Sequence, residues 1–106
     1  MSKFKRHERD MAKLVGGRRS PASGAVWWMK ADGETDEIKF ECKCTDRASI
    51  SITASMLRKI VLQALPHGKV PVIFVRLKVS DALVPTDWAL LPAEDLAFWL
   101  NKEADR

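Results

Sequence analysis

Apolar and polar residues alternate strictly along one stretch near the middle of the chain. A period of two residues predicts a β-strand with one buried face. A tight turn over residues 35–38 would place residues 30–34 beside this strand as a hairpin. The apolar face carries Ile38, Phe40, Cys42 and Cys44, and the polar face carries Lys39, Glu41, Lys43 and Thr45.

The remaining patterns predict three helices and three further strands. Apolar residues recur at helical spacing in residues 3–15, in residues 54–65 behind a possible N-cap at Thr53, and in a last segment opened by Pro92. In the last segment Leu96, Trp99 and Leu100 are expected to be buried, whereas Gln63 of the middle helix is expected on a solvated side. Short apolar runs predict strands at 25–29, 69–77 and 87–91.

The resulting order is helix, strand, strand, strand, helix, strand, strand, helix. A helix that joins two apolar strands implies a crossover, and hence a mixed central sheet flanked by helices, an α/β fold. The whole chain, 1–106, is predicted to be a single domain. Residues 1–24 would form a basic helix and a loop, and residues 25–106 would form the sheet core.

Positive charge is concentrated at the start of the chain. The net charge is +4, yet residues 1–30 alone carry eight Lys or Arg against two acidic residues. This asymmetry favours a polyanionic partner, nucleic acid first, although a solvated basic tail has the same composition. The chain has no apolar run of the ~20 residues that a membrane helix needs, and no secretory signal follows its basic start. We therefore expect a cytoplasmic protein that does not contact membranes.

The cysteines and histidines do not predict a metal site. Cys42 and Cys44 share one strand face, a spacing that suits neither a disulfide nor a zinc site, so free thiols buried in the core are expected. His7 has no partner at a diagnostic spacing and is interpreted as part of the basic face of the first helix.

The hairpin brings candidate chemistry together. In the register set by a turn at 35–38, Asp32 pairs directly with Glu41 and Glu34 pairs with Lys39. Two paired carboxylates repel each other unless a cation lies between them. With Lys43 on the same strand face as Glu41, the arrangement predicts a divalent metal site that also accepts a phosphodiester. The alternative is an exposed hairpin with ordinary Glu–Lys pairs.

Taken together, these segments resemble the PD-(D/E)xK nuclease superfamily, and among its members the archaeal-type Holliday-junction resolvases and small phage endonucleases. The resemblance rests on Glu8 in the first helix, the Arg-Arg-Ser-Pro-Ala-Ser-Gly loop of residues 18–24, Asp32, and the signature Glu41-Cys42-Lys43. It implies a restriction-endonuclease-like αβββαβ core and a single nuclease domain. The family often has Pro or Gly where this chain has Ala31, which leaves Asp36 as a rival to Asp32.

The resemblance also implies roles for these residues. Asp32, Glu41 and the backbone carbonyl of Cys42 would bind Mg²⁺ or Mn²⁺, Lys43 would activate the attacking water, and Glu8 would act on the metal through water. The implied activity is metal-dependent hydrolysis of DNA phosphodiesters, most simply at four-way junctions and by a homodimer. The alternatives are an endonuclease with another DNA target and a non-catalytic nucleic-acid-binding module. DNA contacts would come from Lys5, Arg6, Arg9, Arg18, Arg19, Ser20 and Ser23.

Overall fold

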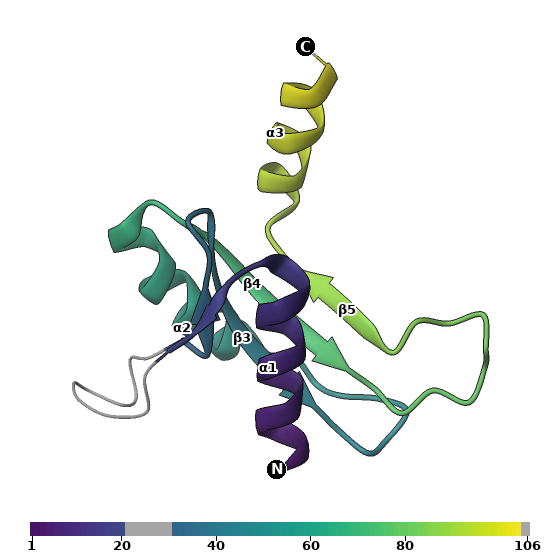
Figure 1. Ribbon diagram of the computed structural model, residues 1–106. Helices are drawn as coiled ribbons and strands as arrows, with labels where there is room; N and C mark the ends of the chain where they lie inside the picture. Colours follow the sequence, from purple (N-terminus) through teal and green to yellow (C-terminus); the bar gives the residue numbers. More distant parts are fainter. Residues whose placement is uncertain (21–30, 105–106) are drawn as a thin grey trace.

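The computed structural model describes residues 1–20 and 31–104 (Figure 1). Within these ranges the three predicted helices are present, and so are the two strands of the predicted hairpin and the strands predicted at 69–77 and 87–91. The strand predicted at 25–29 lies outside the described residues. The elements in order are α1 (Lys3–Val15), β1 (Arg18–Arg19), β2 (Gly33–Glu34), β3 (Ile38–Cys44), α2 (Ala54–Ala64), the short 3₁₀ helix η2 (Leu65–His67), β4 (Val70–Arg76), β5 (Asp87–Leu90) and α3 (Ala93–Ala104).

The five strands form one mixed sheet in the order β1-β2-β3-β4-β5. Only β3 and β4 run parallel, joined by the crossover through α2, and the other neighbours are antiparallel. Arg18 and Arg19, expected in a loop, instead pair with β2 as a two-residue edge strand. β4 is covered by a strand on each side, and residues 72–75 are buried, as its continuous apolar sequence predicts.

The hairpin has the predicted register. Gly33 lies opposite Phe40 and Glu34 lies opposite Lys39. The turn is closed by Thr35, whose hydroxyl accepts hydrogen bonds from the backbone N–H groups of residues 37 and 38. The regular pairing ends at Gly33, however, so Asp32 is not the direct ladder partner of Glu41 that the sequence predicted. The backbone N–H of Asp32 donates instead to the carbonyl of Phe40, at 2.9 Å.

Two apolar clusters hold helices on opposite faces of the sheet. On the α1 face, Met11 and Ala12 pack on Phe40 and Phe74, whose rings meet edge to face with centroids 5.2 Å apart. On the α2 face, Ile60 packs on Ile73 of β4. Since side chains alternate along a strand, Glu41 and Lys43 of β3 point toward the α2 face. The result is an α/β architecture with a mixed five-stranded sheet and with α1 and α2 on either side of it (Figure 1).

The ends of α1 and α2 follow from local sequence. Ser2 caps α1, and Gly16 ends it in the left-handed conformation at φ 69°. The hydroxyl of Thr53 accepts from the N–H of Met56 and caps α2, as predicted. No helix in the described ranges is long and apolar enough to cross a membrane.

The burial predicted for α3 is wrong for two of its three apolar residues. Trp99 is half-buried against the α1-face core, but Leu96 is 45% exposed and Leu100 is 62% exposed. The spacing correctly identified an amphipathic helix, yet Figure 1 shows α3 standing clear of the sheet beyond β5. The described residues therefore cover the apolar stripe of α3 only in part.

Candidate active site

The candidate site lies where β3 continues past the end of β2. Beyond Phe40, β3 still pairs with β4 on one side. On its other side the pairing with β2 ends at Gly33, and Asp32, the residue before Gly33 in the sequence, lies next to β3. The Asp32 carboxylate accepts a hydrogen bond from the backbone N–H of Cys42, with Oδ2 at 2.7 Å. A side chain thus satisfies a donor that a longer β2 would have paired, and this bond holds the Asp32 carboxylate against β3.

Glu41, on β3, carries a buried carboxyl group at the same place. It is 6% exposed, and burial, followed by repulsion from Asp32, raises its pKa to about 7. Its Oε1 atom is enclosed and has no hydrogen-bond partner among the described residues. A buried carboxyl oxygen without a donor is costly unless it is protonated or bound by a cation. The structure therefore fits a positively charged ligand at this position.

Glu8 reaches the same place from α1. Burial raises its pKa, and so do the charge of Asp32 and a hydrogen bond with the Asp32 carboxyl. The ion pair with Arg19, 3.7 Å away, acts in the opposite direction. Asp32 therefore interacts with one carboxyl from each side, Glu8 and Glu41, and it links the helix to β3. That Glu8, Asp32 and Glu41 act together in one catalytic site stays a prediction.

Two lysines balance the charge of Glu41. The ammonium of Lys59, on α2, lies 3.7 Å from Oε1 of Glu41, and Lys43 follows Glu41 by two positions on the same strand face. Both lysines act to lower the pKa of Glu41 against the effects of burial and Asp32. Lys43 was predicted here, whereas Lys59 was not. A helical pattern shows that Lys59 lies away from the apolar stripe, but not which strand residue it faces.

The donor set suits a hard divalent cation. Mg²⁺ is commonly held by one or two carboxylates, with waters and substrate phosphates completing its shell. Asp32 and Glu41 supply two carboxylates, and the enclosed Oε1 atom of Glu41 is the observation that favours a cation. Across residues 1–20 and 31–104, no three His, Cys, Asp or Glu side chains are already arranged around a single metal position. A cation here would therefore need waters or phosphate oxygens as additional ligands.

The structure favours Asp32 over Asp36 as the partner of Glu41. Asp36 is exposed in the hairpin turn and lines a cavity on the α1 face, away from the side of β3 that carries Glu41. Asp32 is the acidic group that raises the pKa values of both Glu8 and Glu41. The acidic groups around Cys42 also raise its thiol pKa, after burial, so this free cysteine stays protonated.

The predicted DNA-contacting residues fall into three groups. Lys5, Arg6 and Arg9 are exposed on α1, and Arg9 lies 3.5 Å from Asp10. Arg18 and Arg19 are exposed on β1 but are held in ion pairs with Glu34 and Glu8. Ser20 donates its backbone N–H to the carbonyl of Asp32, at 2.9 Å. Ser23 lies outside the described residues.

His7 and Gln63 are not surface residues, contrary to expectation. The His7 ring is fully buried, with Nε2 3.8 Å from Asp87 Oδ1, and burial together with the nearby Arg76 lowers its pKa. Gln63 is 8% exposed, and no partner within the described ranges bonds its side-chain amide. Both residues lie on helix faces that pack toward the sheet. Sequence periodicity alone does not show this, because their side chains are polar.

The carboxylate of Glu34 forms ion pairs with three cationic side chains. It contacts Lys39 at 2.7 Å, Lys69 at 2.8 Å and Arg18 at 3.0 Å. Hydrogen bonds from the two lysines lower its pKa to about 2. Because the three cations come from β1, β3 and the start of β4, this network fixes the hairpin to the sheet. The Glu34–Lys39 contact was predicted from the register, and the other two were not.

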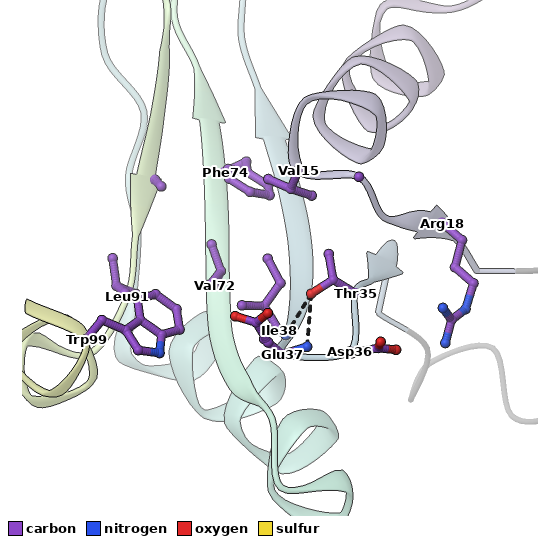
Figure 2. Close-up of a pocket in the computed structure, with 12 residues that line it drawn as sticks. Val15, Arg18, Thr35, Asp36, Glu37, Ile38, Val72, Phe74, Leu91 and Trp99 are labelled. Atoms are coloured by element: carbon purple, nitrogen blue, oxygen red, sulfur yellow. Dashed lines mark hydrogen bonds between the residues drawn. The ribbon is translucent and has the colours of Figure 1, made fainter. Parts of the chain in front are cut away.

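A cavity of about 510 Å³ opens on the α1 face of the sheet, away from the carboxyl groups (Figure 2). Figure 2 shows Trp99 and Leu91 on one side of it and the hairpin turn with Thr35 and Asp36 on the other. Its floor includes Val72 and Phe74 of β4. The hollow is thus mainly an unfilled part of the core face, and it does not contain the candidate catalytic residues.

Comparison with known proteins identifies the fold class. The sequence matches no family model, and no curated protein is detectably similar to it. The fold of the chain is nevertheless similar to that of a solved protein. The chain is similar to the Holliday junction resolvase Hjc of the archaeon Archaeoglobus fulgidus, with a TM-score of 0.55 at 13% sequence identity, over 84% of this chain and 88% of that one. At this identity the similarity defines the fold and leaves the activity to be argued from the site.

Proposed function

We propose that this protein is a metal-dependent endodeoxyribonuclease, most simply one that resolves four-way DNA junctions as a homodimer. The observation that carries the proposal is the meeting of Glu8, Asp32 and Glu41 at one sheet edge, with Lys43 and Lys59 beside them. Acidic groups that raise one another's pKa are typical of catalytic sites. The resolvase-like fold supports the same conclusion, since the cluster sits on the strand and hairpin that carry the Glu-x-Lys signature.

Each residue has a distinct role in this proposal. Asp32, Glu41 and the Cys42 carbonyl would hold Mg²⁺ or Mn²⁺, which would polarise the scissile phosphate when bound. Lys43 would orient the attacking water and offset negative charge as it develops on the phosphate. Glu8 would orient metal-bound water from the α1 side. Lys59 would exchange its contact with Glu41 for one with a DNA phosphate once a metal neutralises that carboxylate.

Cleavage of synthetic DNAs tests the activity. The substrates are a four-way junction, a linear duplex, a flap and a single strand, each with and without Mg²⁺. We expect junction cleavage that Glu41→Gln and Lys43→Met each reduce on the order of 10³-fold, the scale found when a transition-state-stabilising group is removed. Glu37→Gln, an exposed carboxyl in the hairpin turn, is the control and should cleave normally.

The outcomes separate the alternatives. Cleavage that survives both active-site substitutions contradicts the assigned residues. Equal cutting of all four substrates favours an endonuclease with another DNA target. Junction binding without cleavage in Mg²⁺ or Mn²⁺ favours the non-catalytic module.

Thermal unfolding gives a readout that does not depend on activity. A ligand that binds only the folded protein raises its melting temperature. We expect Mg²⁺ at pH 8 to raise the melting temperature of the wild-type chain and of Glu37→Gln, but not that of Glu41→Gln. An equal rise in all three proteins would place the metal elsewhere.

A further inference from the structure

Three aromatic side chains among the described residues are more than half exposed: Phe4 of α1 at 58%, Trp88 of β5 at 52% and Phe98 of α3 at 64%. Trp88 and Phe98 belong to residues 87–101, a segment with three acidic residues and no lysine or arginine. Phe4, by contrast, has a lysine on either side of it in the sequence and an arginine two positions later. A single exposed apolar residue is ordinary, but an aromatic ring among cations is the combination that binds unstacked nucleobases.

Contacts within the first turn of α1 position the Phe4 ring. The hydroxyl of Ser2 accepts a hydrogen bond from the backbone N–H of Lys5, at 3.2 Å. The ammonium of Lys3 lies 2.7 Å from the carboxylate of Asp46, in the loop after β3, and 5.2 Å from the centroid of the Phe4 ring. The ring is therefore placed beside the end of β3 before any ligand binds, which lowers the entropic cost of a contact with it.

Phe4 lies one helical turn from the candidate active site. Glu8 follows it by four positions in α1, and residues at this spacing lie on the same face of a helix with their Cβ atoms roughly 6 Å apart. Lys5 is close to the same carboxyl, since its charge lowers the pKa of Glu8 against the effects of burial and Asp32. Because successive nucleotides of one strand stack roughly 3.4 Å apart, a phosphate held at the site would bring a nearby base within reach of the Phe4 ring.

Stacking on a protein side chain requires a base with a free face. In a continuous duplex each base is covered on both faces by its neighbours, whereas a base at a branch point or in an unpaired stretch can leave the stack. Stacking of one base on an aromatic side chain changes affinity by roughly fivefold to a hundredfold. Contacts between lysines and phosphates occur on all of these DNA forms and carry no such preference.

We propose that Phe4 is the stacking platform of a nucleobase subsite beside the candidate active site, and that this subsite selects DNA with an unstacked base over continuous duplex. The subsite rests on the proposed function for DNA as its ligand, and on the contacts of the first turn for its location. Lys3 and Lys5 bind the flanking phosphates. The ion pair between Lys3 and Asp46 can open for this purpose at little cost, because its two side chains are 45% and 81% exposed.

Equilibrium binding without metal tests the subsite separately from cleavage. The probes are a duplex with a short unpaired stretch in one strand and a fully paired duplex of the same length, followed by fluorescence anisotropy in EDTA. The wild-type chain should bind the first more tightly. Phe4→Leu, which keeps an apolar side chain but removes the ring, should weaken binding to the unpaired form on the order of tenfold and leave the paired duplex unchanged. Phe4→Trp should retain the preference.

Two control variants separate stacking from other effects of α1. Leu14→Ala changes a leucine that is 71% exposed on the same helix, and it should bind both DNAs as the wild-type chain does. Lys5→Ala should weaken binding to both DNAs alike and reduce the salt dependence by about one phosphate contact. Phe4→Leu should leave the salt dependence unchanged, because a stacked base releases no counterion.

The outcomes that overturn the subsite are distinct from those that overturn the proposed function. A wild-type chain without preference for the unpaired form contradicts the subsite, and so does Phe4→Leu binding that equals wild type. An equal loss on both DNAs also contradicts it, since the substitution would then act through the fold of α1. If Mg²⁺ supports no cleavage of any DNA while the Phe4-dependent preference persists, the proposed function is wrong and the subsite stands.

Discussion

The two edges of this sheet carry side chains of opposite character, charged at one edge and apolar at the other. The β1–β2 side gathers charged residues, and ion pairs with nearby groups largely compensate them, as around Glu34. The β5–α3 side exposes apolar residues that nothing in the described part of the chain covers completely. The comparison shows that one small core can hold a charged site rigidly on one side while leaving its other side incomplete.

Close backbone packing at the charged side gives the largest predicted effect on stability. A Cβ atom on Gly33 would run into the ring of Phe40 and lie 2.7 Å from the carbonyl oxygen of Arg18. We therefore expect Gly33→Ala to lower the free energy of unfolding by about 3 kcal/mol, as for overpacked interiors. Urea unfolding measures this change.

The control for this substitution is Gly68→Ala. Gly68 has φ 63° but open space around its Cβ position. Only the left-handed conformation is penalised there, so the expected loss is about 1 kcal/mol. Equal losses at the two positions would show that the Phe40 and Arg18 contacts do not constrain the hairpin.

Glu41 should destabilise the protein at neutral pH. Its pKa is about 7 in the folded protein, against an ordinary value of 4.5. Between these pH values the folded chain keeps a proton that the unfolded chain has lost, so this group's contribution to stability falls as pH rises from 4.5 to 7. Glu41→Gln, which mimics the neutral carboxyl, should increase the free energy of unfolding by about 2 kcal/mol at pH 8.

The same substitution should have little effect at pH 4, where the wild-type carboxyl is also neutral. Urea unfolding at the two pH values measures both differences. A loss of stability at pH 8 would show that Glu41 is stabilised as an anion without metal, and would remove the case for a cation site built on its enclosed oxygen.

The proposed homodimer should make stability depend on concentration. If two copies fold and associate together, each tenfold dilution lowers the apparent stability of the dimer by up to about 1.4 kcal/mol. The melting temperature of the wild-type chain should therefore fall on dilution. A constant value would contradict the proposed homodimer.

Glu34 gives the smallest of these effects, with the opposite pH dependence. Its pKa is about 2 in the folded protein, so its stabilisation is present above pH 4.5 and is lost as pH falls toward 2. Glu34→Gln should lower the free energy of unfolding by about 1 kcal/mol at pH 7, since the carboxylate is partly open to solvent. The two unfolding curves should converge near pH 2. A difference that persists there would come from packing and not from charge.

The sequence predicted the features that depend on local pattern. The alternation from Ile38 to Cys44 and the turn at Thr35 were enough to predict the hairpin register, and the mixed order of strands followed from α2 as a crossover. The pairing of Asp32 with Glu41 was only partly right. Whether β2 continues to Asp32 depends on how its end packs against β1 and the hairpin, which periodicity does not reveal.

Features that depend on distant packing could not be predicted. Lys59 and Glu41 are 18 positions apart, and only the angle at which α2 crosses the sheet brings them together. His7 and Gln63 are polar residues on buried faces, so a pattern based on hydrophobicity assigns them to the surface. For Leu96 and Leu100 the helical pattern predicted burial, and both side chains are exposed.

The hydrogen bond from Cys42 to Asp32 has a consequence for solubility. A strand with an unpaired backbone edge can recruit an edge from another molecule and so begin aggregation. The Asp32 carboxylate occupies the N–H of Cys42 and places a negative charge at this edge. Asp32→Ala would remove both, so this variant should also be more prone to aggregation than the wild-type chain. Asp32→Asn keeps an acceptor for that N–H, which makes it the safer variant in which to study the site.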